Sequence, residues 1–256
     1  MSKKVVLAIG GSDPSGGAGI QADLATFMDH GVSGIFAVTA VTAQNDEELL
    51  AIHPTPADIL TQQISTACKN NDVGAAKIGM IATMANTQAI TWFLRRAKLQ
   101  HVVVDPVLHS SSGASLLEAD AYSFYRQRLL PFASVITPNL SEASALAGMQ
   151  VASLETMRTA AEVIHREASR LKGPLKGDLA VVVKGGHLDG DAVDVLFDGK
   201  EYHSFTEKRV SGRSPRGTGC RFASAIAANL ANGKEIVEAV SDAKDYLTEY
   251  IQKSDQ

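Results

Sequence analysis

The segment Val5-Val6-Leu7-Ala8-Ile9 runs directly into Gly10-Gly11-Ser12-Asp13-Pro14-Ser15-Gly16-Gly17-Ala18-Gly19, and a helical pattern follows over residues 17–30. The apolar run is typical of a strand buried on both faces. The five glycines of the second stretch would let the backbone approach a ligand closely, and a flexible connection is the plainer alternative. Their spacing matches neither the dinucleotide-binding fingerprint nor a P-loop. These residues predict a strand, a ligand-facing loop and a helix.

Short apolar runs and longer helical patterns continue to alternate along the chain. Because several of the runs lack polar alternation, they are typical of strands in a parallel sheet that helices cover on both faces. The order predicts a three-layer α-β-α fold with a mainly parallel central sheet and right-handed crossovers. Further strands are expected at residues 35–41, 75–78, 101–105, 134–137 and 180–184, and helices near 57–70, 84–98, 116–130, 141–147 and 154–171.

The pattern changes after residue 184. Residues 192–198 and 200–206 read as strands joined at Asp198-Gly199, which predicts an antiparallel edge hairpin near 192–206. Two helices follow, one with apolar residues spaced at i, i+4 and i+8 and one near residues 236–251. Since neither a linker nor a repeat divides the chain, we expect residues 1–256 to form a single domain.

Composition excludes several classes of protein. The chain has 256 residues, enough to bury a core without a disulfide or metal. Its two cysteines, Cys68 and Cys220, argue against a disulfide framework and fit a reducing compartment. The net charge of −4 gives no reason to bind nucleic acid or an anionic membrane. The first apolar run is too short for a signal peptide or a membrane span, so a cytoplasmic enzyme or binding protein is expected.

Two candidate ring-binding residues follow predicted strands, where ligands bind in open α/β sheets. Gln44 follows the second strand, and its amide offers both a donor and an acceptor to the edge of a heteroaromatic ring. Met80 follows the third strand and could pack on an aromatic ligand. An ordinary polar loop residue and ordinary core packing are the respective alternatives.

Charged residues follow the later strands. Asp105 is placed to organise Mg²⁺ through water. Lys184 places a cation where phosphate could bind, although a solvated lysine before a turn is the alternative. After the fifth predicted strand, Asn139 or Ser141 could cap the next helix. Glu142 would then lie in the first turn of that helix, where a carboxylate is favoured in any case.

The segment Pro215-Arg216-Gly217-Thr218-Gly219-Cys220 opens a predicted helix. Glycines at a helix N-terminus leave N–H groups free for an anion, and a thiol in that first turn is expected to favour its thiolate. The alternative for Cys220 is a small buried apolar residue. The sequence contains neither a zinc-binding spacing of Cys and His nor the G-x-S-x-G of serine hydrolases.

These motifs resemble, in order and spacing, the hydroxymethylpyrimidine/phosphomethylpyrimidine kinases of thiamine biosynthesis. The resemblance covers residues 5–250 and implies a ribokinase-like fold. It also implies ATP-dependent phosphorylation of 4-amino-5-hydroxymethyl-2-methylpyrimidine and of its monophosphate, giving the diphosphate. The motifs lie at residues 11–23, 39–44, 77–80, 105–107, 137–143, 184–187 and 217–220.

The resemblance also implies roles for individual residues. On the substrate side, Gln44 would bind the pyrimidine edge, Gly11 and Val107 would lie near the ring, Met80 would pack on it, and Asp23 would lie at the substrate end of the pocket. Cys220 would deprotonate or position the hydroxyl, and the amides of Gly217, Thr218 and Gly219 would hold the phosphoryl group. Lys184 would neutralise phosphate charge, while Asp105, Asn139 and Glu142 would organise Mg²⁺ and its waters. A homodimer is expected by analogy.

Two arginines depart from the family pattern. Arg216 and Arg221 flank the Gly-Thr-Gly-Cys run, where family members usually carry His and Thr. Either arginine could bind phosphates of ATP or of the monophosphate in a bidentate manner, or alter the contacts with ATP. Two alternative functions therefore stay open: a pyridoxal kinase of the same family, and a pyrimidine-binding module without turnover.

Overall fold

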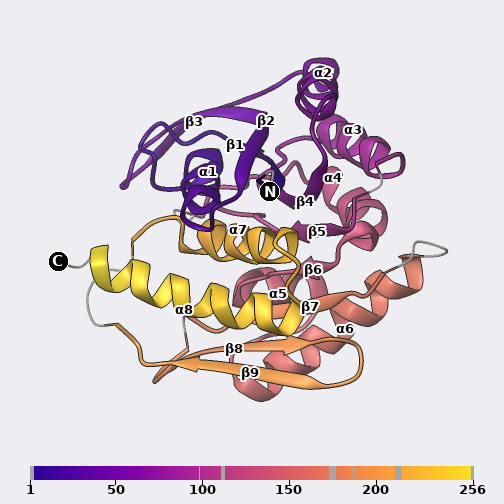
Figure 1. The fold of residues 1–256 in the computed structure, drawn as a ribbon. Coiled ribbons are helices and arrows are strands. Elements are labelled where there is room, and N and C mark those ends of the chain that lie inside the picture. The colour runs from indigo at the N-terminus through magenta and orange to yellow at the C-terminus, as the bar shows by residue number, and fades with distance from the viewer. Residues whose placement is uncertain are drawn as a thin grey trace.

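The computed structural model describes residues 3–97, 99–110, 113–172, 177–186, 188–210 and 215–254. Within these ranges nine strands form one sheet in the order β3-β2-β1-β4-β5-β6-β7-β8-β9 (Figure 1). The central strands run parallel, and antiparallel strands lie at both edges. The parallel strands are β1 (Val5–Gly11), β2 (Ser33–Gln44), β4 (Val73–Ile78), β5 (His101–Val104), β6 (Val135–Ile136) and β7 (Ala180–Lys184). The antiparallel strands are β3 (Leu49–Pro54), β8 (Ala192–Phe197) and β9 (Tyr202–Glu207).

Helices cover both faces of this sheet. The valines of β5 show the division, because Val102 and Val104 pack into one layer and Val103 into the other. Burial on both faces explains why these strands are apolar throughout, and it confirms the predicted three-layer fold. One layer holds α1 (Gly19–Asp29), α7 (Thr218–Ala231) and α8 (Ile236–Ser254), and the other holds α2 (Ala57–Cys68), α3 (Met84–Leu94), α5 (Leu140–Ala147) and α6 (Leu154–Lys172) (Figure 1). Over the described ranges, none of these helices has both the length and the apolar character needed to cross a membrane.

The two edges of the sheet differ in how well the sequence predicts them. The edge hairpin near 192–206 is confirmed, since β8 and β9 pair antiparallel with Phe197 opposite Tyr202. The opposite edge strand, β3, was not predicted. It is short and partly exposed, and Pro54 at its end is a residue that edge strands tolerate. Pairing with β3 extends β2 as far as Gln44, which lies opposite Leu49.

The predicted helix near 116–130 begins later than expected. The backbone before it is bound to the segment that precedes α3: Leu117 bridges Ala82, and the Glu118 carboxylate accepts a hydrogen bond from the Met84 amide at 2.9 Å. These contacts hold the chain extended, so helical geometry starts only at Ala121. The helix is α4 (Ala121–Phe124), continued by a π-helical turn (Tyr125–Leu129) and a 3₁₀ turn (Leu130–Phe132).

Candidate active site

A cavity of about 440 Å³ lies at the carboxyl ends of the parallel strands. It gathers residues from the loop after β1, the ends of β2, β4, β5 and β7, and the start of α7. With the exception of Arg221, the site residues selected from the sequence all line it: Gly11, Asp23, Gln44, Met80, Asp105, Val107, Asn139, Glu142, Lys184, Arg216, Gly217, Thr218, Gly219 and Cys220. His187, at the end of the motif at residues 184–187, lies outside the described residues.

The substrate side of the cavity begins with Gly11 and Met80. A Cβ atom on Gly11 would lie 2.8 Å from the Met80 sulfur, so only a glycine lets the thioether pack on this backbone. The Thr39 hydroxyl donates to the Met80 carbonyl at 2.6 Å and fixes that loop. The cavity therefore has a thioether wall, which suits a flat aromatic ring.

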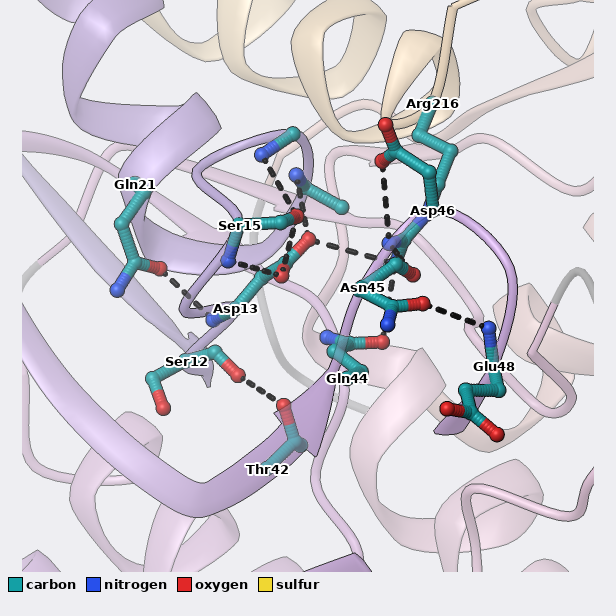
Figure 2. Close-up of polar contacts among 12 residues, drawn as sticks. Ser12, Asp13, Ser15, Gln21, Thr42, Gln44, Asn45, Asp46, Glu48 and Arg216 are labelled. Atoms are coloured by element: carbon teal, nitrogen blue, oxygen red, sulfur yellow. Dashed lines mark hydrogen bonds and ion pairs between the residues drawn. The ribbon is translucent and has the colours of Figure 1, made fainter. Parts of the chain in front are cut away.

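Buried Asp13 organises the glycine loop beside this wall. Its carboxylate accepts hydrogen bonds from the Ser15 amide at 3.0 Å and the Ala18 amide at 2.9 Å. The Asp13 amide in turn donates to the Gln21 side chain at 2.9 Å. The Thr42 hydroxyl donates to the Ser12 carbonyl at 2.7 Å, which ties the loop to β2 (Figure 2). The loop is thus held in one shape by the protein itself.

Arg216 joins three segments at the rim of the cavity (Figure 2). Its Nη2 donates to Gln44 Oε1 at 2.9 Å and lies 3.3 Å from Asp13 Oδ2. Its Nη1 donates to the Asn45 carbonyl and lies 3.6 Å from Asp46 Oδ1. The sequence left open whether Arg216 binds phosphate of ATP or of the monophosphate, or alters the contacts with ATP; here its guanidinium contacts Gln44 on the substrate side of the cavity.

Arg221 has a different position from the one expected. Its side chain is buried, and its guanidinium lies over the Tyr250 ring at 4.1 Å from the ring centroid. This contact joins α7 to α8, and Arg221 lines neither this cavity nor the neighbouring one described below. The hypothesis that Arg221 binds phosphate is wrong.

The start of α7 forms the candidate phosphate site. Gly217 has φ +75°, and a Cβ atom there would collide with the Gly17 carbonyl oxygen, so this close approach requires a glycine. The first helical bond runs from the Arg221 amide to the Gly217 carbonyl at 2.9 Å. The N–H groups of Gly217, Thr218, Gly219 and Cys220 precede that bond, so they are the ones a helix N-terminus offers to an anion.

Lys184 and Asp105 lie opposite this helix start. Their Nζ and Oδ1 atoms are 2.9 Å apart, and the Thr137 hydroxyl also contacts Asp105 Oδ1 at 3.3 Å. A Cβ atom on Gly219 would lie 3.2 Å from Lys184 Nζ, which brings the lysine close to the free amides. Burial would lower the pKa of Lys184, but Asp105 and Glu142 outweigh burial and raise it. Lys184 is therefore a permanent cation at the candidate phosphate site.

Asn139 and Glu142 form a capping box at the start of α5. Asn139 Oδ1 accepts from the Glu142 amide at 2.9 Å, and Glu142 Oε2 accepts from the Asn139 amide at 2.8 Å. The capping role considered from the sequence is thus confirmed for Asn139. Burial, together with the charge of nearby Asp105, raises the pKa of Glu142 to about 7, although Lys184 opposes the rise.

Asp105 and Glu142 supply the hard oxygen donors that Mg²⁺ prefers, and one or two carboxylates are the usual protein share of a magnesium–phosphate site. The raised pKa of Glu142 fits the same interpretation, because a second cation would relieve the repulsion from Asp105. Larger groups of three or more His, Cys, Asp or Glu that could hold a metal are absent from the described residues. The residues present therefore fit a magnesium ion that also binds substrate phosphate.

A buried ion pair, which the sequence analysis missed, lies at the floor of the cavity. Lys77 Nζ contacts Asp23 Oδ1 at 2.7 Å, and neither side chain is more than 1% exposed. The Ser224 hydroxyl donates to the same oxygen at 2.8 Å, and Asp23 Oδ2 has no partner in the described structure. A single lysine inside an otherwise apolar strand was the available signal. Asp23 is therefore held by Lys77 and Ser224 at the base of the cavity.

Cys220 lies half-buried in the first turn of α7 above this pair. Burial raises the pKa of its thiol, and the charges of Asp23 and Asp105 add to the rise. Lys77 and a backbone hydrogen bond from Gly19 act in the opposite direction but do not overcome burial. The expectation that the helix start favours the thiolate is therefore wrong for the protein without ligands.

A second cavity of about 350 Å³ adjoins the first. The two share Asn139, Lys184, Thr218 and Gly219, so they meet at the candidate phosphate site. The second cavity has an apolar wall from α7 and α8, made of Phe222, Leu247 and Ile251. Its floor carries a buried ion pair between Lys244 Nζ and Asp194 Oδ2 at 2.8 Å. An apolar cavity that opens onto a phosphate site suits a nucleotide base.

Comparison with known proteins shows which family this chain is similar to. The family model for phosphomethylpyrimidine kinase matches residues 13–256. The hydroxymethylpyrimidine/phosphomethylpyrimidine kinase of Rhizobium meliloti is 42% identical over 254 residues, which cover 98% of this chain and 92% of the relative.

Two solved structures show the same fold. A phosphomethylpyrimidine kinase from Clostridium difficile aligns with a TM-score of 0.82 at 37% identity, covering 97% of this chain and 100% of the other. The pyridoxal kinase of Staphylococcus aureus, in complex with AMP-PCP and pyridoxal, aligns with a TM-score of 0.86 at 33% identity, covering 98% and 88%. The predicted ribokinase-like fold is confirmed. With nearly the whole chain matched in each comparison, the protein is a kinase and belongs to the phosphomethylpyrimidine kinase family.

Proposed function

We propose that this protein phosphorylates 4-amino-5-hydroxymethyl-2-methylpyrimidine, and then its monophosphate, with ATP. The observation that carries the proposal is the junction of two cavities at the start of α7, where Cys220, the first-turn amides and Lys184 converge. The first cavity, with Gln44 and Met80, suits a flat nitrogen heterocycle. The second suits a nucleotide base, and relatives named for the same two reactions support the assignment.

The proposed reaction is an in-line phosphoryl transfer. A bond forms between the substrate hydroxymethyl oxygen and the γ-phosphorus of ATP, while the bond from that phosphorus to the β–γ bridging oxygen breaks. ADP leaves with the electron pair of the broken bond. The hydroxyl proton passes to Cys220 in its thiolate form, which Lys77 favours and burial disfavours. Positioning and charge neutralisation supply most of the rate in such transfers.

The charged groups around the junction have distinct proposed roles. The amides of Gly217, Thr218 and Gly219 hold the transferring phosphoryl group, and Lys184 neutralises its charge. Asp105 and Glu142 would hold a magnesium ion, and Asn139 would orient one of its waters. The ion would supply positive charge to the β- and γ-phosphate oxygens when it is bound.

Product analysis tests this function directly. Pure protein with the pyrimidine, ATP and Mg²⁺ should yield first the monophosphate and then the diphosphate, resolved by chromatography and mass spectrometry. Cys220→Ala should lower turnover by roughly 10²–10⁴-fold, the usual contribution of a positioned acid–base group. Wild-type protein that makes no phosphorylated pyrimidine at saturating substrate would exclude the proposed function.

The second candidate function is phosphorylation of pyridoxal. It is favoured by the structural similarity to the Staphylococcus aureus pyridoxal kinase, one form of which is in complex with pyridoxal. A competition assay with both substrates in one reaction separates the candidates by kcat/KM. A higher kcat/KM for pyridoxal would reverse the assignment.

Two further predictions concern the whole protein in its cell. We expect a homodimer, which sedimentation or light scattering would distinguish from a monomer. We also expect a cytoplasmic location, which fits the reducing compartment inferred from cysteine usage and which cell fractionation would test.

A further inference from the structure

Arg216 is the charged residue of the cavity rim that the proposed chemistry does not use. Its side chain is 18% exposed and contacts Asp13, Gln44 and the turn that follows β2 (Figure 2). Asp13 is itself fully buried, with its oxygens committed to the glycine loop. The guanidinium is therefore anchored on a fixed part of the protein and reaches from there to Gln44.

The backbone next to Arg216 explains its direction. Gly217 stacks against Gly17 and Ala18 so closely that no other residue fits there. A Cβ atom on Gly17 would lie 3.5 Å from the Arg216 Cβ, so the arginine also begins its path beside the glycine loop. From this starting point its side chain follows the loop toward the end of β2 and away from the amides at the start of α7.

The contact with Gln44 has a fixed polarity. A guanidinium carries five N–H donors and no acceptor, so the Gln44 atom that faces it must be the carbonyl oxygen. The 2.9 Å distance from Arg216 Nη2 to Gln44 Oε1 has this arrangement. Gln44 Nε2 then lies on the other side of the amide, and in the described part of the chain no protein group accepts a hydrogen bond from it. Gln44 lines the cavity, and the atom that it leaves free for a ligand there is Nε2, which is a hydrogen-bond donor.

We infer that Arg216 is a positioning residue that locks Gln44 as a hydrogen-bond donor, so that the cavity selects rings with a lone-pair nitrogen at the bound edge. This inference rests on the proposed function, because it names how that site recognises its ring. Without Arg216 the amide can rotate and present its oxygen, which repels a ring lone pair. Arg216 thus acts on ring recognition and not on phosphate.

A double-mutant cycle tests the inference by calorimetric titration of the pyrimidine without ATP. Gln44→Met and Arg216→Met should each weaken binding about tenfold or somewhat less, as expected for one lost hydrogen bond. The double variant should bind within twofold of Gln44→Met alone, because Arg216 has nothing left to position. Arg216→Lys, which keeps a donor, should recover most of the loss. Arg170→Met removes an arginine that is 68% exposed and should leave binding unchanged.

Kinetic measurements separate ring recognition from phosphate binding. Arg216→Met should raise KM for the pyrimidine and for its monophosphate by the same factor, with a much smaller effect on kcat and on KM for ATP. A loss confined to ATP, a loss larger for the monophosphate, or additive effects in the cycle would overturn the inference.

The cycle is informative even where the proposed function fails. If wild type prefers pyridoxal, the proposed pyrimidine kinase function is wrong. Wild type, the two single variants and the double variant are then titrated with pyridoxal, whose ring nitrogen also has a lone pair. Coupling between Gln44→Met and Arg216→Met would then still support the inference. Wild-type protein that binds neither ring would overturn both proposals.

Discussion

Lys77 and Asp23 are two opposite charges that solvent does not reach, joined at 2.7 Å beneath Cys220. Burial raises the pKa of Asp23, whereas the carboxylate raises the pKa of Lys77 against the effect of burial. Each charge is therefore tolerated because the other is present. Removal of one partner leaves an uncompensated charge in the core, which costs far more than the pair contributes.

We therefore predict that Lys77→Met lowers the free energy of unfolding by about 3–5 kcal/mol, measured by urea denaturation. Lys77→Met combined with Asp23→Leu should recover a large part of that loss, because no lone charge is left behind. Lys253→Met provides the matched control: this lysine is 75% exposed beside Glu249, and its loss should change stability by less than about 0.5 kcal/mol. A single-variant loss as small as the control would show that the buried pair is not coupled.

The thiol of Cys220 gives the second prediction at this scale. Because burial raises its pKa, the thiolate fraction is small at neutral pH and grows as the pH rises. In a Cys68→Ser background, the rate of alkylation of Cys220 by iodoacetamide should keep rising with pH beyond the range of an ordinary cysteine. Mass spectrometry of the labelled peptide measures this rate. A plateau near neutral pH would mean that the helix start and Lys77 outweigh burial after all.

At the scale of elements, the glycine loop and the start of α7 support each other through one close contact. Gly217 has φ +75°, and its α-carbon faces the Gly17 carbonyl. Gly217→Ala would meet both the backbone penalty and a collision, whereas Gly16→Ala, with φ +78° and open space around it, would meet the penalty alone.

Gly16→Ala should therefore cost about 1–2 kcal/mol of stability, and Gly217→Ala clearly more. Gly217→Ala should also weaken nucleotide binding, since the amides next to it would move. Thermal unfolding and titration with ADP measure the two effects. Equal losses for the two variants would indicate that the contact between the loop and α7 can relax.

Elements differ in how far the sequence predicts them, and burial explains the difference. The central strands were predicted because burial on two faces leaves unbroken apolar runs, as in Val181-Val182-Val183 of β7. The edge strand β3 carries a short apolar run, Leu49-Leu50-Ala51-Ile52, but all of its residues are at least partly exposed, so this run does not come from burial on two faces. Site residues such as Gln44, Asp105 and Lys184 were predicted from their place after a strand and from their side-chain chemistry, whereas Gly11 and Val107 were expected only from the family resemblance. The direction in which the Arg216 side chain points could not be predicted, because it depends on contacts with residues 13 and 44–46, which lie far from it in the sequence.

At the scale of the whole molecule, a helix from the end of the chain covers strands from its first half. Helix α7, near the C-terminus, packs against β1, β4, β5 and α1, all from the first half of the sequence. Its residues Phe222 and Ile226 share one buried cluster with Val6 of β1 and Val103 of β5. The first half therefore has an uncovered apolar face until α7 is in place, and the cavity between them is incomplete for the same reason.

This arrangement predicts one cooperative unfolding transition for the whole chain. The two cysteines report on its two halves, because Cys68 ends α2 and Cys220 lies in α7. Pulse alkylation across a urea series, read by mass spectrometry, should give the same midpoint for both, with protein in saturating urea as the reference for full labelling. A substrate that binds between the halves should raise the free energy of unfolding by about 2.7 kcal/mol at one hundred times its Kd, and so should shift both midpoints to higher urea together. Two separate midpoints, or a ligand that protects only one cysteine, would mean that the chain folds as two units and that α7 is not needed by the first half.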